Sequence, residues 1–252
     1  MSDILSDDEL LRYNRQIILK SFDFEGQEAL KQARVLVIGA GGLGCAAAQY
    51  LAVAGVGHLT LVDFDVVERS NLQRQVLHCD ARLGQPKVIS AATALRALNP
   101  YLTVEATQAQ ADAALLDALL PSHHLILDCS DNLTTRNLLN RRARAHRVPL
   151  VSGAAIRFEG QVCSFLWHEG EPCYECLSQL FGEQALTCVE AGVLAPVVGL
   201  VGSVQALEAI KILAGCGEPL THRMLLIDGL SGQFRPLRLP RRADCPCCGE
   251  AP

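Results

Sequence analysis

The sequence predicts an α/β protein with a doubly wound, mostly parallel β-sheet and added antiparallel strands. Short runs rich in Val, Leu and Ile alternate with helical stretches as far as residue 167, as in sheets whose strands are buried on both faces. Three glycines at G-x-G-x-x-G spacing follow the first run, and an acidic residue ends the second. Strand, glycines, helix, strand and acid in this order are typical of Rossmann-like folds.

The first 33 residues are predicted to be helical. Ser6 and Glu9 form a capping-box pattern ahead of an amphipathic run. That run contains Arg12 and Arg15. The two arginines are either surface charges or groups that reach phosphates, including those of a neighbouring subunit.

The stretch from residue 34 to residue 63 is predicted to bind a nucleotide. A strand from Arg34 to Ile38 leads into Gly39, Gly41 and Gly44, and a helix runs on to about residue 54. The glycines allow backbone amides to approach phosphate, and the helix N-terminus adds partial positive charge. A second strand, 59–62, ends at Asp63, which is placed to accept ribose hydroxyls. The alternative is a tight turn without a ligand.

Basic residues after this unit favour ATP over NAD. Arg69, Arg74 and Lys87 follow within 25 residues of Asp63. A triphosphate carries more charge than a pyrophosphate and usually needs Arg, Lys and a divalent metal to offset it. Any one of these residues, taken alone, could be a solvated surface charge.

The rest of the sheet follows in the same alternation. In a strand order of 3-2-1-4, the carboxyl ends of the strands line one crevice. The remaining predicted elements are helices at 86–98 (with Pro86 in the first turn), 111–120 (stopped by Pro121) and 133–145, parallel strands at 102–106, 124–128 and 150–155, and an added antiparallel strand at 158–167.

Asp131 is expected at this crevice, just after the strand at 124–128. A carboxylate facing phosphates needs a cation between them, so Asp131 is predicted to bind Mg²⁺. The alternative role is the N-cap of the following helix, and both roles are compatible.

The composition changes from Glu171 onwards, without a clear linker. We divide the chain into an N-terminal helical segment (1–33), an ATP-binding Rossmann-like region (34–170) and a C-terminal part (171–252), all within one compact unit. The uncharged stretch from Ala191 to Leu207 is shorter than the roughly 20 apolar residues of a membrane span. It is predicted to be a buried core or interface helix.

Charge and composition exclude several classes of function. Half of the 252 residues are hydrophobic, and the formal net charge is −5, which argues against nucleic acid as the main partner. The acidic start lacks the basic region of a signal peptide. Eleven cysteines, an odd number, argue against a disulfide framework and for a reducing cytoplasm.

Two C-x-x-C pairs predict a structural Zn²⁺ site. Cys173, Cys176, Cys245 and Cys248 supply four thiolates, which leave no open position for water. The site would pin the C-terminal tail to the body of the protein. Redox pairs are the main alternative.

The other cysteines and the histidines receive weaker predictions. Cys247 is expected to be a bystander, and Cys188 in a polar loop is either a nucleophile or simply packed. The seven histidines show no ligand spacing and receive no role. The cysteines in apolar contexts are expected in the core: Cys45, Cys79, Cys129, Cys163 and Cys216.

Together these motifs resemble the family of ubiquitin-activating-type adenylyltransferases, over essentially the whole chain. Its branch that serves molybdenum-cofactor synthesis is the most similar. The motifs are RYNRQIIL (12–19), GQEAL (26–30), GAGGLG (39–44), Asp63, SNLQRQ (70–75), Lys87, DCSDN (128–132), CYEC (173–176), TCVEAGVLAPVVG (187–199) and CPCC (245–248).

The resemblance implies a homodimer that activates a small ubiquitin-like sulfur carrier with a C-terminal Gly-Gly tail. The enzyme would join AMP to the terminal carboxylate and release pyrophosphate, and a separate protein would donate sulfur. The implied carrier is the small subunit of molybdopterin synthase. Alternatives are the thiamine-pathway carrier, an NAD-dependent oxidoreductase and a non-catalytic zinc scaffold.

The resemblance also implies roles for individual residues. Arg74 and Lys87 would hold phosphates, Asp131 the Mg²⁺, and Arg15 would reach in from the other subunit. Cys188 matches a cysteine that relatives link covalently to the carrier, and the four C-x-x-C cysteines match zinc ligands. The expected ATP site comprises Gly39, Gly41, Gly42, Gly44, Asp63, Ser70, Asn71, Leu72, Gln73, Arg74, Lys87, Asp131 and Asn132.

Overall fold

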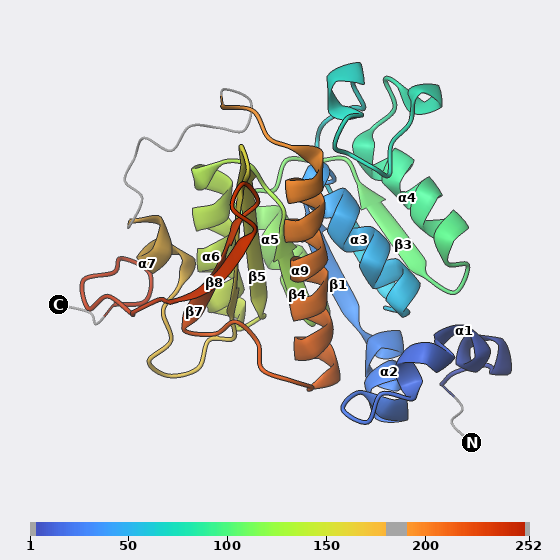
Figure 1. The fold of residues 1–252 in the computed structure, drawn as a ribbon, viewed down its shortest axis with the longest axis horizontal. Helices are drawn as coiled ribbons and strands as arrows, with labels where there is room; N and C mark the ends of the chain where they lie inside the picture. Colours follow the sequence, from blue (N-terminus) through green and yellow to red (C-terminus); the bar gives the residue numbers. More distant parts are fainter. Residues whose placement is uncertain (1–3, 180–190, 250–252) are drawn as a thin grey trace.

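The computed structural model describes residues 4–179 and 191–249. Within these residues one eight-stranded sheet has the order β3-β2-β1-β4-β5-β6-β7-β8 (Figure 1). Neighbours from β3 to β5 are parallel, and those from β5 to β8 are antiparallel. The predicted order 3-2-1-4 and the added antiparallel strands are therefore confirmed.

The element bounds agree with most of the predicted ranges. The strands are β1 Arg34–Ile38, β2 His58–Val62, β3 Thr103–Thr107, β4 Leu125–Asp128, β5 Leu150–Ile156, β6 Glu159–Phe165, β7 Arg223–Asp228 and β8 Gln233–Arg238. The α-helices are α1 Asp7–Ile17, α2 Asp23–Gln32, α3 Gly42–Ala54, α4 Lys87–Leu98, α5 Ala113–Leu119, α6 Leu133–His146, α7 Tyr174–Ser178 and α9 Ala195–Ala214.

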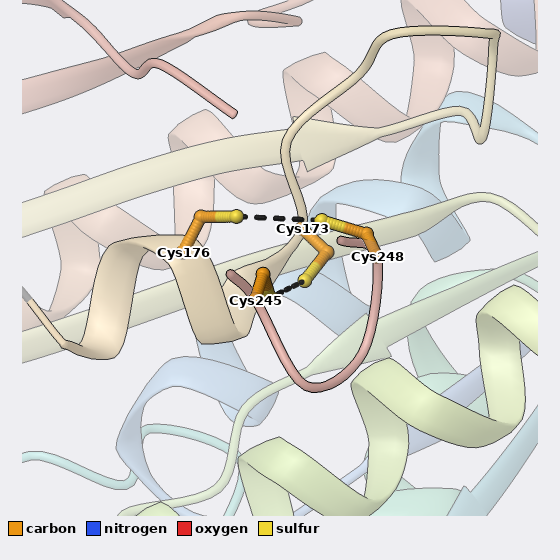
Figure 2. Close-up of side chains that lie close together, drawn as sticks. All are labelled: Cys173, Cys176, Cys245 and Cys248. Carbon is orange, nitrogen blue, oxygen red and sulfur yellow. Dashed lines mark hydrogen bonds between the residues drawn. The ribbon is translucent and has the colours of Figure 1, made fainter. Parts of the chain in front are cut away.

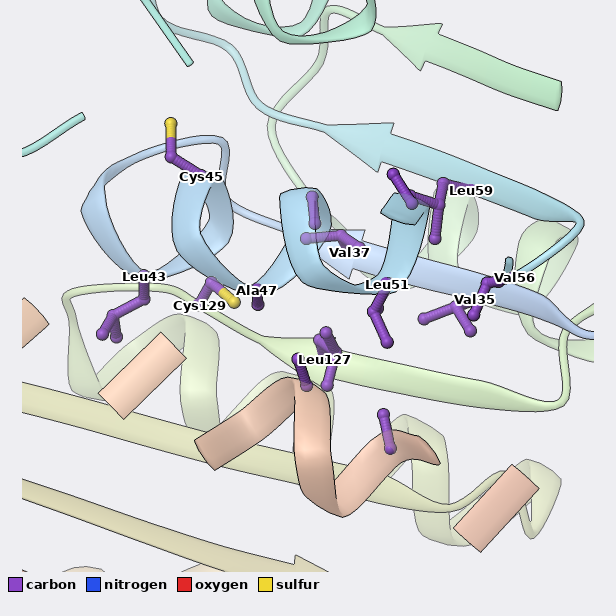
Figure 3. Close-up of a cluster of buried hydrophobic side chains, with 14 of the residues drawn as sticks. Val35, Val37, Leu43, Cys45, Ala47, Leu51, Val56, Leu59, Leu127 and Cys129 are labelled. Carbon is purple, nitrogen blue, oxygen red and sulfur yellow. The ribbon is translucent and has the colours of Figure 1, made fainter. Parts of the chain in front are cut away.

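Alternating side chains of β1 face two different layers. Val35 and Val37 join the cluster formed with α3, α4 and α9 (Figure 3). Leu36 and Ile38 join a second cluster that contains α5, α6 and α7 residues. Because side chains alternate along a strand, a strand covered on both faces must be apolar throughout. The doubly wound arrangement follows from this pattern.

Close glycine contacts bring α3 against its neighbours. A Cβ on Gly44 would lie 1.8 Å from the Gly39 carbonyl oxygen, and Gly39 itself has φ +97°. On the crossing helix α9, a Cβ on Gly202 would lie 2.6 Å from the Leu43 carbonyl oxygen. Glycine is therefore required at these positions if the loop and the two helices are to pack this closely.

The long apolar helix α9 packs across the sheet. It contacts α3, β4, β5 and β6. By length and composition alone α9 could cross a membrane, but 44% of its most apolar window is buried in the fold. The Glu208 carboxylate on it is buried and accepts hydrogen bonds from Ser164 Oγ (2.9 Å) and Leu220 N (2.6 Å). We interpret α9 as the predicted core helix.

The N-terminal helices lie at the opposite end of the sheet from the glycine loop (Figure 1). The predicted capping box of Ser6 and Glu9 begins α1. The Glu9 carboxylate also pairs with Lys31 of α2. Tyr13 accepts a hydrogen bond of 2.7 Å from Asn99, just after α4. These contacts fix α1 and α2 to the body.

Some local predictions were wrong. Pro86 is the N-cap of α4 rather than a residue of its first turn. Pro121 does end α5, whose last residue is Leu119, although a short 3₁₀ turn, 120–122, follows. Cys79 is exposed and Cys216 only half-buried, because both lie in turns outside the sheet. Cys45, Cys129 and Cys163 are buried as predicted.

Candidate nucleotide pocket and metal centre

A pocket opens at the carboxyl ends of β1, β2 and β4. Its volume is about 440 Å³, within the usual range for small-molecule sites. It lies where the strand order changes direction on either side of β1, the usual ligand position in doubly wound sheets. The predicted residues that line it are Gly39, Gly41, Gly42, Asp63, Asn71, Arg74, Lys87, Asp131 and Asn132.

The glycine loop is held in place by backbone contacts. Asp63 Oδ2 accepts a hydrogen bond of 2.7 Å from Ala40 N. Gly42 begins α3, and a Cβ there would lie 2.5 Å from Val198 Cγ1. The loop therefore presents the N-terminus of α3 to the pocket, where backbone amides favour an anion.

Three residues on one wall form a continuous network. Asp63 Oδ1 accepts from Asp65 N at 2.8 Å, and the Asp65 carboxylate lies 2.7 Å from Lys87 Nζ. The Lys87 side chain is only 7% exposed. Burial of its stem fixes the ammonium at the pocket wall, where it can exchange Asp65 for a phosphate.

Arg74 borders the same pocket. Its Nη1 donates to the Ser70 carbonyl oxygen at 3.1 Å, and its side chain is half-buried against the pocket. Asn71 stabilises the turn by accepting from Glu68 N at 3.3 Å. The turn thus holds Arg74 at the border of the cavity.

The segment after β4 closes the pocket from another side. Asp131 is exposed and lines it. The N-cap of α6 is Asn132, whose side chain accepts from Thr135 N at 2.8 Å. The alternative capping role for Asp131 was therefore wrong, and its carboxylate remains available to a cation.

Several predicted residues lie outside the lining of this pocket. Gly44 packs against the loop from behind, and Ser70, Leu72 and Gln73 belong to the turn that carries Arg74. Arg15 is exposed on α1, at the far end of the sheet. Cys188 lies outside the described residues.

Sequence reasoning missed several polar residues of the lining, and three of them have informative contacts. Asp65 pairs with Lys87. Gln75 is buried, and its Oε1 has no hydrogen-bond partner among the described residues. Arg136 donates a hydrogen bond of 2.8 Å to the Ser130 carbonyl oxygen. The acidic pair around Phe64 and the second Gln of SNLQRQ were the available signals for the first two.

The four predicted zinc ligands converge on one point (Figure 2). Their sulfur atoms all lie within 4.8 Å of one another, and all four residues are buried. The Sγ–Sγ distances are 3.6 Å for Cys173–Cys245 and 3.4 Å for Cys176–Cys248. A tetrahedral ion with bonds of about 2.3 Å would place sulfurs about 3.8 Å apart. The cluster therefore fits a metal ion.

The chemistry of the cluster also fits a cation. Burial raises the pKa of Cys176 and Cys248. A hydrogen bond with Cys247, together with burial, raises the pKa of Cys173. Four adjacent thiolates would repel one another, and a bound cation removes that cost.

Helix α6 supports this cluster. Asn140 Oδ1 accepts from Tyr174 N at 2.8 Å, and its Nδ2 lies 3.1 Å from Cys247 Sγ. Arg141 forms a bidentate ion pair with the Glu175 carboxylate, with N···O distances of 2.7 and 3.0 Å. Cys247 is therefore a neighbour of the cluster that helps to anchor the tail.

Comparisons with known proteins agree on one family. The ThiF family model matches residues 13–247. The molybdopterin-synthase adenylyltransferase of Escherichia coli (strain K12) is 60% identical over 98% of this chain and 99% of its own length. The enzyme of the same name from Haemophilus influenzae is 57% identical, covering 94% of this chain and 97% of that one.

Solved structures show the same fold. The structure of PaaA has a TM-score of 0.82 at 28% identity, covering 96% of this chain and 77% of that one. Escherichia coli MccB with ATP has a TM-score of 0.83 at 22% identity, covering 99% and 76%. The second likeness concerns the fold alone.

Proposed function

This chain belongs to the ThiF family and is an adenylyltransferase, and from that premise we propose that it activates a sulfur-carrier protein for molybdenum-cofactor synthesis. The carrier would be the small subunit of molybdopterin synthase, with its ubiquitin-like fold and Gly-Gly tail. The observation that carries this proposal is the 57–60% identity, over nearly full length, to adenylyltransferases named for that synthase.

The pocket supports ATP as the co-substrate. Glycine-loop amides, Asp63 and the cations Arg74 and Lys87 border one cavity. In this arrangement Asp63 would accept the ribose hydroxyls, and the loop and the two cations would hold the phosphates. An NAD-dependent oxidoreductase would have less use for these cations.

The reaction needs little from the protein beyond position and charge. The carrier carboxylate is already ionised at neutral pH, so no general base is required. One of its oxygens attacks the α-phosphorus, an O–P bond forms, and the bond from the α-phosphorus to the bridging oxygen breaks. Pyrophosphate leaves with the electron pair. Arg74 and Lys87 would stabilise the charge on the phosphates.

The charge balance of the lining supports a divalent cation. Among the described residues, four carboxylates (Asp63, Asp65, Glu68, Asp131) and three cations (Arg74, Lys87, Arg136) border the cavity. A bound triphosphate would leave a large negative excess. Mg²⁺ supplies compensating charge when bound, and the exposed Asp131 carboxylate is our proposed ligand for it.

The wider assembly is proposed on the same footing. We place the enzyme in the cytoplasm as a homodimer in which Arg15 of one subunit reaches the phosphates of the other. Exposed apolar residues on α1, at its C-cap and on α9, among them Leu11, Ile18 and Leu207, suit such an interface. A separate protein would supply the sulfur, and the four-cysteine cluster would hold structural Zn²⁺.

The proposal is tested by isotope exchange. The protein, Mg²⁺, ATP and the small subunit of molybdopterin synthase should exchange labelled pyrophosphate into ATP. The same subunit without its terminal Gly-Gly is the control, and should give no exchange.

Other carriers and ligands separate the alternatives. Faster exchange with the thiamine-pathway carrier would move the enzyme to that pathway. Absence of exchange with both carriers would refute carrier adenylation. Titration with NAD(H) tests the oxidoreductase alternative, and titration with ATP tests the zinc-scaffold alternative, which predicts no binding.

A further inference from the structure

The buried side chain of His78 forms a hydrogen bond to the backbone of the glycine loop. His78 Nε2 lies 2.9 Å from the Ala40 carbonyl oxygen, and Nδ1 lies 2.8 Å from Ser90 Oγ. The residue is only 7% exposed and is not part of the pocket lining. Ala40 is held on its other side by Asp63, through its N–H.

These partners fix the state of the ring. A carbonyl oxygen only accepts hydrogen bonds, so Nε2 must carry the proton, and Nδ1 then accepts from the Ser90 hydroxyl. Burial lowers the pKa of His78, which keeps the ring neutral at neutral pH. Ser90 lies one turn after Lys87 on α4, so the same helix carries the phosphate-binding lysine and the support for His78.

The direction of one backbone amide follows from this contact. The Ala40–Gly41 peptide is trans, and in a trans peptide the C=O and N–H bonds point in opposite directions. His78 binds the carbonyl oxygen on the buried side, so the Gly41 N–H points to the other side. Gly41 itself borders the cavity.

We propose that His78 is a positioning residue that aims the Gly41 N–H at the nucleotide phosphates. It acts through Ala40 and touches no substrate. The inference rests on the proposed function in so far as it takes the pocket to bind a triphosphate. It gives a task to a histidine for which the sequence offered none.

The test compares two ligands that share a nucleoside and differ in phosphates. Calorimetry measures the affinities of an ATP analogue with a non-cleavable α,β bridge and of adenosine. His78→Phe should weaken binding of the analogue about tenfold, the scale of one charge-assisted hydrogen bond, and leave adenosine unchanged. His78→Gln can still donate to Ala40 and should recover most of the loss.

A second buried histidine provides the matched control. His123 is 6% exposed, and its ring nitrogens contact Leu119 O (2.7 Å) and Thr60 Oγ1 (2.8 Å), away from the loop. His123→Phe should cost stability without changing the ratio of the two affinities. An unchanged ratio in His78→Phe, or the same change in His123→Phe, would refute the inference.

Two further outcomes remain distinguishable. If His78→Phe does not fold, Ser90→Ala tests the inference instead. This variant removes the hydroxyl that fixes the tautomer of the His78 ring. That variant should lower the ratio by a few fold, and no change would refute the inference. If the unaltered protein binds the analogue no better than adenosine, the proposed function fails instead.

Discussion

Arg69 and Arg74 show how differently two arginines of one turn are placed. Arg69 is highly exposed and approaches Asp80 at 3.7 Å, with both side chains more than 70% exposed. Such a pair is screened by solvent and contributes little. Arg74 borders the cavity. The sequence pointed to both as cations near the triphosphate, and only the fold separates them.

Arg74→Ala should lower pyrophosphate exchange by at least about 100-fold, the usual effect of removing one donor that stabilises developing charge. The thermal midpoint should not change, because within residues 4–179 and 191–249 the guanidinium makes one hydrogen bond, of 3.1 Å to the Ser70 carbonyl oxygen. Exchange assays and thermal unfolding measure both effects. Arg69→Ala is the matched control and should keep its activity. Equal loss in the two variants would remove the role that we give to Arg74.

At the scale of elements, the capping box of α1 makes the N-terminal helices sensitive to acid. Burial alone would raise the pKa of Glu9, but bonds from Lys31 and Ser6 outweigh it and lower the pKa below the usual 4.5. The folded state therefore binds the proton less tightly than the unfolded state. This stabilisation is fully present above pH 4.5 and is lost as the pH falls through the lowered value.

Glu9→Gln should lower the free energy of unfolding at pH 7 by about 1–2 kcal/mol, because it replaces charge-assisted bonds with neutral ones. Urea unfolding of both proteins from pH 7 to pH 3.5 should show this difference shrinking below pH 4.5. A difference that stays constant over this range would contradict the assigned ionisation of Glu9.

The crossing of α3 and α9 depends on the missing Cβ of Gly202. Gly202→Ala places a carbon 2.6 Å from the Leu43 carbonyl oxygen, and relieving that contact should cost about 1–3 kcal/mol. Gly199, one turn earlier, would meet nothing within 4 Å. Gly199→Ala should therefore stabilise α9 by up to about 1 kcal/mol. Urea unfolding compares them, and equal effects would contradict the close crossing.

Much of the sheet and of the glycine loop could be predicted, because local sequence patterns indicate them. Strands β1, β2 and β4 are buried on both faces, so they are mostly apolar runs, and the glycine spacing marks the turn after β1. Strands β7 and β8 were missed. Every residue of β8 is exposed and it contains Pro236, so neither alternation nor burial distinguishes it from a loop. His78 and Asp65 were missed because the partners that give them a place near the pocket, Ala40 and Lys87, lie 38 and 22 residues away.

At the scale of the molecule, the cysteine cluster joins the C-terminal tail to α7 and α6. We expect Cys245→Ser to lose one equivalent of metal per chain and to lower the thermal midpoint, because metal binding to such a site contributes directly to folding. Elemental analysis and thermal unfolding measure the two effects. Cys247→Ser is the control, since Cys247 lies beside the cluster and should leave the metal bound. Metal-free protein of unchanged stability would favour redox pairs.

The proposed dimer can be tested by complementation between two inactive variants, which requires residues from two chains in one site. Helix α1, which carries Arg15, lies at the opposite end of the sheet from the glycine loop (Figure 1), so Arg15 can serve a phosphate only in a second subunit. Arg15→Ala and Arg74→Ala should each abolish exchange when purified alone. In a two-fold dimer that mixes them, one of the two sites keeps both arginines.

Random mixing of the two variants makes half of the dimers mixed, with one working site each, so exchange should recover to about a quarter of the unaltered activity. Unfolding and refolding the two proteins together, followed by the exchange assay, measures it. Each variant refolded alone is the control. Recovery would require two chains to build one site, whereas continued inactivity of the mixture would show that Arg15 and Arg74 do not complement each other across subunits.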